Sequence, residues 1–181
     1  MAMSMPTKAW TLEELHRLPD DGNKYELIRG ELFVTPPPSV DHQEVLARLN
    51  SILAVYVQKH GRGRVHFARA VIRFDGSEAE PDLMVRPLAP DVHGNAWEKL
   101  PPPLLVIETL SPTTRRRDLV SKREYYLDAG AGEYWVLDAE RREIRVIRRG
   151  VADVVARESL VWPGSAAEPL VVDVAELFSG L

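Results

Sequence analysis

Hydrophobic residues recur along the chain at two periods, one typical of helices and the other of strands. Between residues 45 and 57 they follow the 3.6-residue period, which predicts an amphipathic helix from an N-cap at Ser39 to about Lys59. A second helix is predicted to begin near 111–114 and to end at about Ala129, before two glycines. Each helix is expected to bury one face.

Short runs rich in β-branched and aromatic residues predict strands between turn signals. The runs lie at 25–28, 31–34, 65–68, 71–74, 82–85, 104–109, 133–137, 143–148 and 151–155, with a short strand and one helical turn at 170–177. The first two flank Arg29 and Gly30 and predict a hairpin. The three runs between 65 and 85 are predicted to form a meander. The run at 104–109 should pair in parallel with 133–137, because a helix separates them.

The order of the core elements is helix, three strands, helix and strand, with a hairpin on each side. This order predicts an α/β fold with a mixed β-sheet flanked by helices, in one domain spanning 1–181. A short helix opened by the capping-box pattern of Thr11 and Glu14, and ending near Pro19, precedes the core. Residues 87–103 hold five prolines and little periodicity, so we interpret them as a long surface loop and hypothesise a lid.

Composition limits the chemistry that the chain can perform. With 181 residues and 45% hydrophobic content, it can bury one sizeable core. It has no cysteine, so a metal would need oxygen or imidazole ligands, which favours Mg²⁺ or Mn²⁺ over structural zinc. The apolar runs are strand-sized and the N-terminus lacks the pattern of a signal peptide. We therefore expect a cytoplasmic protein with no membrane partner.

The net charge of −4 argues against a general nucleic-acid coat protein, which would neutralise many phosphates. Arginines nevertheless gather locally, at 62–73, at 115–117 and at 141–149. These clusters are compatible with a nucleic-acid surface and equally with an ordinary solvated face.

Two carboxylates stand at the edges of predicted strands, and a lysine follows in the next helix. Asp82 begins the run at 82–85, Glu108 lies near the end of 104–109, and Lys122 lies on the second helix. This trio could hold a divalent metal and cut a phosphodiester. The alternative is that Asp82 only begins a strand and that Glu108 pairs with a buried arginine. Motifs for nucleophilic serine, nucleotide-cofactor and H-E-x-x-H zinc chemistry are missing from the sequence.

Longer stretches carry a resemblance to a known family. They are YELIRGEL at 25–32, PPPSVDHQ at 36–43, EPDLMV at 80–85, VIETLSPTTRRRDLVSKREYYLDAG at 106–130 and EYWVLD at 133–138. With these stretches the chain resembles, over roughly residues 11–150, the Uma-two family of the PD-(D/E)xK nuclease superfamily. The resemblance implies a restriction endonuclease-like fold and metal-dependent hydrolysis of DNA phosphodiester bonds.

The chain departs from the superfamily pattern at one position. That pattern places a lysine two residues after the second acid, where this chain has Leu110. The resemblance to the Uma-two pattern implies that Lys122 takes this role from the following helix, four residues after Asp118 and on the same helix face. Its long flexible stem could bring the ammonium group to the strand end.

The resemblance also implies roles for the candidate metal ligands. Asp82 and Glu108 would bind Mg²⁺ or Mn²⁺, and the main-chain carbonyl of Thr109 would complete the protein's share of ligands. Lys122 would position the attacking water or stabilise charge on the phosphate. Glu26, in the hairpin, would bind a second metal or orient water.

The remaining candidates would hold DNA. His42 lies at the start of the long helix, where a helix N-terminus favours phosphate, and Arg115, Arg116 and Arg117 would contact the DNA backbone. A homodimer is expected, because cutting both strands favours two sites related by symmetry.

Several alternatives stay open at this level. Lys122 could be an ordinary surface lysine, Glu26 an exposed hairpin residue, and His42 a capping or structural histidine. The whole protein could be a module that keeps the nuclease fold and binds nucleic acid or a protein partner without cutting.

Overall fold

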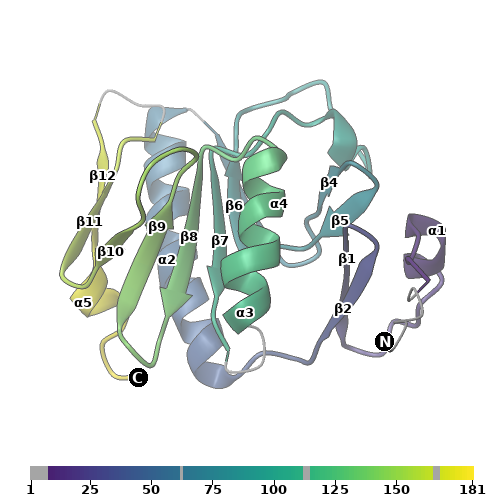
Figure 1. The fold of residues 1–181 in the computed structure, drawn as a ribbon. Helices are drawn as coiled ribbons and strands as arrows, with labels where there is room; N and C mark the ends of the chain where they lie inside the picture. Colours follow the sequence, from purple (N-terminus) through teal and green to yellow (C-terminus); the bar gives the residue numbers. More distant parts are fainter. Residues whose placement is uncertain (1–7, 62, 112–114, 165–167) are drawn as a thin grey trace.

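The computed structural model describes residues 8–61, 63–111, 115–164 and 168–181. In these ranges a mixed sheet lies between helices, which confirms the predicted α/β fold (Figure 1). Its strands run in the order β10-β9-β8-β7-β6-β3. Their bounds are β3(Arg64–Phe67), β6(Leu83–Arg86), β7(Leu105–Thr109), β8(Glu133–Asp138), β9(Glu143–Ile147) and β10(Val154–Ala156).

The parallel pairing of β7 with β8 is confirmed, with Glu108 opposite Val136. The connection between them is helical and consists of α3(Arg115–Arg117), a π-helical turn η2(Asp118–Lys122) and α4(Arg123–Asp128). The predicted start of this helix at 112–114 lies outside the described residues. The π-turn was not predicted, since an amphipathic pattern does not distinguish it from an α-helical turn.

The long helix α2(Val40–His60) covers the other face of the sheet, behind it in Figure 1. Ser39 caps it by accepting a hydrogen bond from the His42 amide, and Gly61 ends it in the left-handed conformation. Strand alternation divides β7 between two hydrophobic clusters. Leu105 packs in the cluster that holds α2, whereas Val106 packs in the cluster that holds α4. Glu108, two residues after Val106, therefore faces α4.

A second sheet has the order β2-β1-β5-β4, with bounds β1(Lys24–Ile28), β2(Glu31–Thr35), β4(Ile72–Phe74) and β5(Ser77–Ala79). The predicted hairpin is confirmed, and its turn residues Arg29 and Gly30 both have positive φ. The predicted meander is wrong, because β3 pairs directly with β6 while β4 and β5 join β1. Strand β5 was missed because its polar Glu78 is buried through an ion pair with Arg73.

The remaining elements lie near the two ends of the chain, and β11 and β12 pair with each other in a separate two-stranded sheet. The capping box of Thr11 and Glu14 opens α1(Leu12–Leu15), as predicted. The C-terminal part forms β11(Ser159–Trp162), which was not predicted, then β12(Leu170–Asp173) and α5(Val174–Leu177). None of the helices in the four described ranges combines the length and apolar character needed to cross a membrane.

The loop at 87–103 contains a short 3₁₀ turn, η1(Trp97–Lys99), and joins the end of β6 to the start of β7. Because these strands are antiparallel, with Leu83 opposite Ile107, the loop lies at the end of the pair opposite to Asp82 and Glu108. The loop hypothesised to be a lid therefore does not cover Asp82 and Glu108.

Candidate active site

Asp82 and Glu108 lie next to each other at one edge of the central sheet. The register of β6 on β7 places Asp82, just before Leu83, beside the end of β7. The Thr109 amide donates a 2.8 Å hydrogen bond to Asp82 Oδ2 and fixes that carboxylate. Both acids line a pocket of about 600 Å³ whose other walls come from 22–24, 35–39, 41–43, 67–69, 109–111 and 117–118 among others. The two carboxylates predicted from the sequence as metal ligands therefore share one cavity.

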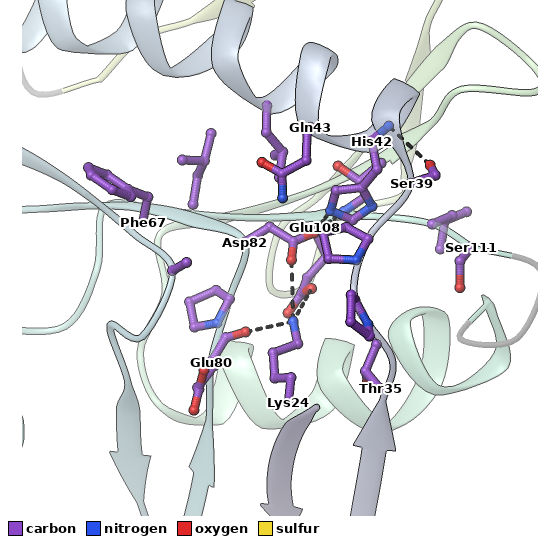
Figure 2. A pocket seen from close by; sticks show the side chains of 18 of the residues that line it. Lys24, Thr35, Ser39, His42, Gln43, Phe67, Glu80, Asp82, Glu108 and Ser111 are labelled. Carbon is purple, nitrogen blue, oxygen red and sulfur yellow. Dashed lines mark hydrogen bonds and ion pairs between the residues drawn. The ribbon is translucent and has the colours of Figure 1, made fainter. Parts of the chain in front are cut away.

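A third charged group, Lys24, lies between these carboxylates and was missed from the sequence. Its Nζ is 3.2 Å from Asp82 Oδ1, 3.8 Å from Glu108 Oε2 and 3.0 Å from the main-chain oxygen of Glu80. Figure 2 shows the lysine reaching up from β1 to meet them. A signal was available, because Lys24 and Glu26 are two residues apart on one strand and so share a face.

Glu108 is held from the opposite side by buried donors. Its Oε1 accepts hydrogen bonds of 2.6 Å from Lys122 Nζ and 2.6 Å from the Tyr126 hydroxyl. The Lys122 side chain has 0% exposure, so the interpretation of it as a surface lysine is wrong. Its ammonium group lies behind Glu108 and leaves Oε2 directed towards Lys24. Lys122 is thus placed to orient the carboxylate.

Glu26 is also fully buried, and the interpretation of it as an exposed hairpin residue is wrong. Its Oε1 lies 2.8 Å from Lys122 Nζ and accepts the Glu80 amide at 2.9 Å. Its Oε2 lies 4.0 Å from Arg117 and has no hydrogen-bond partner among the described residues. Lys122 therefore joins Glu26 to Glu108 inside the protein.

Burial and charge move the pKa values of the three acids in different directions. Burial opposes ionisation of Asp82, but Lys24 and the hydrogen bond from His42 hold its pKa well below the ordinary value. Burial raises the pKa of Glu108 to about 7, although Lys122 and Lys24 act to lower it. Burial also opposes ionisation of Glu26, yet Lys122, Lys24 and Arg117 lower its pKa overall. Asp82 is thus ionised at neutral pH, while Glu108 exchanges a proton there.

The predicted DNA-binding residues lie in different environments. His42, in the first turn of α2, places Nε2 3.2 Å from Asp82 Oδ2 and lines the pocket (Figure 2). Arg117 also lines the pocket and packs over the Phe33 ring. Arg116 is exposed, whereas Arg115 is paired with Asp138 at 2.8 Å.

The donor set around Lys24 suits a hard divalent cation. Oxygens of Asp82, Glu108 and the Glu80 main chain surround one cationic group, and Thr109 Oγ1 nearby is a buried oxygen without a hydrogen-bond partner in the described chain. Within the described ranges no three His, Asp or Glu side chains gather around one point. Two carboxylates with carbonyl and water ligands are a common set for Mg²⁺, so the residues fit such an ion.

Comparisons with known proteins agree with this architecture. Residues 12–175 match Uma2, a family described as "Putative restriction endonuclease", and the chain therefore belongs to this family. Among solved structures, the chain is similar to a "putative nuclease belonging to DUF820" from Anabaena variabilis, at 22% identity and a TM-score of 0.78. That similarity covers 94% of this chain and 98% of the other and confirms the fold. No curated protein matches the chain.

Proposed function

We propose that the protein is a metal-dependent endonuclease that hydrolyses phosphodiester bonds of DNA. One observation carries the proposal: Asp82 and Glu108, from adjacent strands, hold a single cationic group between them at a pocket of about 600 Å³. Membership of the Uma2 family, with its nuclease description, supports the same reaction class.

Asp82, Glu108 and the main-chain carbonyl of Thr109 would hold Mg²⁺ or Mn²⁺, and the Glu80 carbonyl lies on the same side. The bound ion would supply Lewis acidity, polarising a phosphoryl oxygen and lowering the pKa of a water. The chain itself arranges the ligands. The Thr109 amide and His42 orient Asp82, and Lys122 holds Glu108 from behind.

Substrate contacts would come from the rim of the pocket. His42 and the amides of the first turn of α2 would face a phosphate, which a helix N-terminus favours. Arg117 would contact the DNA backbone from the pocket wall, with exposed Arg116 beside it. Glu26 would act indirectly, by holding Lys122 in place.

A homodimer is part of the proposal, because two sites related by a twofold axis can cut both strands of a duplex. Sedimentation of the purified protein with and without a DNA duplex would test it. A single species at 20.4 kDa under both conditions would contradict it.

The test of the reaction is cleavage of supercoiled plasmid and of labelled duplex, single-stranded and branched oligonucleotides with Mg²⁺ or Mn²⁺. Asp82→Asn and Glu108→Gln should lose activity while keeping the wild-type fold, whereas Asp91→Asn, in the loop at the other end of the strands, should keep activity.

The competing function is a module that keeps the fold without cutting. It is favoured by the burial of Lys122 and by Leu110 at the usual lysine position. If the wild-type protein cuts none of the DNA forms with either metal, this module becomes the better description.

A further inference from the structure

Lys24 occupies the centre of the oxygen ligands that the proposed metal would use. It is the first residue of β1, and its ammonium group contacts Asp82 Oδ1, Glu108 Oε2 and the Glu80 carbonyl. Its side chain is 22% exposed and lines the pocket. The lysine therefore stands between the two carboxylates on the side that is open to the cavity.

Lys122 and Lys24 neutralise different carboxylate oxygens at this site. Lys122 neutralises Glu26 and one oxygen of Glu108 from the interior. Asp82 Oδ1 and Glu108 Oε2, which face the pocket, meet Lys24 instead. Two carboxylates that share a partly buried site repel each other unless a cation separates them. Lys24 supplies that cation within the chain.

We propose that Lys24 is the internal counter-ion of the metal site: its ammonium group holds the cation position in the metal-free protein, and a divalent ion binds by displacing it into the pocket. This inference rests on the metal-dependent function proposed above. It states which group occupies the metal position before the metal binds and where that group goes afterwards.

Electrostatics and ligand distances indicate that the metal ion replaces the Lys24 ammonium group and does not bind beside it. A divalent ion and an ammonium group a few ångströms apart repel each other strongly in a site of low dielectric. Mg²⁺ needs ligands at about 2.0–2.1 Å, so the carboxylates must close around the point that Lys24 now contacts. The lysine stem is flexible, and the cavity beside it gives the displaced ammonium room. The displaced group would then lie on the side from which a phosphate enters.

The proposal predicts that removing the lysine charge strengthens metal binding. Binding of Mn²⁺ to the purified protein can be followed by the electron paramagnetic resonance signal of the free ion, without any DNA. Lys24→Met should lower the dissociation constant at least about tenfold, the ratio that corresponds to about 1.4 kcal/mol. Lys24→Arg keeps the charge and should remain close to wild type, as should Lys59→Met, whose lysine pairs with Glu168 on the surface.

The outcomes separate this inference from the function on which it rests. If Lys24→Met and wild type bind Mn²⁺ equally and Asp82→Asn does not bind, the metal site stands and displacement is wrong. If no variant binds Mn²⁺ at millimolar concentration, the metal-dependent function fails, and displacement fails with it.

A second measurement uses only the wild-type protein, so its result does not depend on whether a variant folds correctly. Lysines are acetylated by a water-soluble reagent with and without Mg²⁺, and each site is quantified by mass spectrometry. Labelling of Lys24 should rise several-fold with Mg²⁺, because the amine leaves its carboxylate partners, while labelling of Lys59 stays constant. Unchanged or reduced labelling of Lys24 under saturating Mg²⁺ would overturn the proposal.

Discussion

Lys122 Nζ lies 2.6 Å from Glu108 Oε1, and both side chains are buried in the layer between the central sheet and α4. The same ammonium group is 2.8 Å from Glu26 Oε1, so one lysine serves two acids from different sheets. A buried charge that loses its partner is costly, because the remaining ion has neither water nor a counter-ion. This lysine is therefore central both to stability and to the orientation of Glu108.

Replacing Lys122 with Met should destabilise the protein by about 3–5 kcal/mol, as expected when one partner of a buried ion pair is removed. Urea unfolding at pH 7 measures the change. Lys59→Met, on the surface, serves as the matched control and should stay within about 0.5 kcal/mol of wild type. Equal effects of the two substitutions would show that the Lys122 pairs contribute no special stability. Adding Glu26→Gln to Lys122→Met should recover part of the loss, because one unpaired charge is then removed.

The raised pKa of Glu108 predicts a pH dependence of stability in the metal-free protein. Between the ordinary value of 4.5 and about 7, the folded state holds a proton on Glu108 that the unfolded state has released. The contribution of this group is therefore full below pH 4.5 and is lost as the pH rises to 7, by at most roughly 3 kcal/mol. Unfolding of wild type and Glu108→Gln at pH 5, 6, 7 and 8 isolates it. The difference between the two proteins should change across this window, and a constant difference would contradict the shift.

Protonation of Glu108 also predicts that metal affinity increases with pH, whereas its contribution to stability decreases. A carboxylate must lose its proton to become a ligand, so Mn²⁺ affinity should increase from pH 5.5 to 7.5. Asp82 remains ionised over this range, because its pKa is held low. The increase should therefore follow Glu108, and calorimetric titrations in two buffers of different ionisation enthalpy would detect the released proton. Affinity that is independent of pH would argue that Glu108 binds the metal already ionised.

Local signals predicted much of the fold. The cap at Ser39, the turn at Arg29 and Gly30, and the parallel pairing across a helix depend on neighbouring residues or on general chain geometry, and all three are confirmed. Strand β5 has no such signal. Its Glu78 is buried because Arg73 pairs with it, and the hydroxyl of its Ser77 accepts a hydrogen bond from the Arg29 amide; both contacts exist only in the folded protein.

The residues of the candidate site could likewise be predicted only in part from the sequence. Asp82 and Glu108 could be found because each lies at the end of an apolar run, and adjacent strand ends meet in a sheet. The spacing of Lys24 and Glu26 predicts only that they share a strand face. The position of Lys24 between Asp82 and Glu108 depends on how β1 lies against the central sheet, which the spacing does not reveal. The burial of Lys122 likewise depends on the π-turn and on Glu26 from a different sheet.

The loop at 87–103 is predicted to affect stability without affecting the metal site. Arg86, at the end of β6, is buried and donates hydrogen bonds to the main-chain oxygens of Pro101 and Val71. Arg86→Met should cost about 3–6 kcal/mol, since two hydrogen bonds from a charged group are lost and each contributes about 1.5–3 kcal/mol. Proteolysis within 87–103 should become faster. Mn²⁺ affinity should remain at the wild-type value, and a large loss of affinity would restore a role for this loop at the site.

The three adjacent arginines are predicted to contribute unequally to DNA affinity. Arg117 lines the pocket beside the carboxylates, where its guanidinium also lies near Asp118 and Glu26. Arg115 pairs with Asp138 and is not part of the pocket lining. In an Asp82→Asn background that prevents cutting, Arg117→Gln should weaken duplex binding and reduce the slope of log affinity against log salt by about 0.9, the value for one phosphate contact. Arg115→Gln should leave the slope unchanged, because Arg115 lies outside the pocket lining and pairs with Asp138. Fluorescence anisotropy at several salt concentrations measures both slopes. Equal reductions for the two variants would mean that the Asp138 pair opens on binding and that the DNA extends past the pocket along α3.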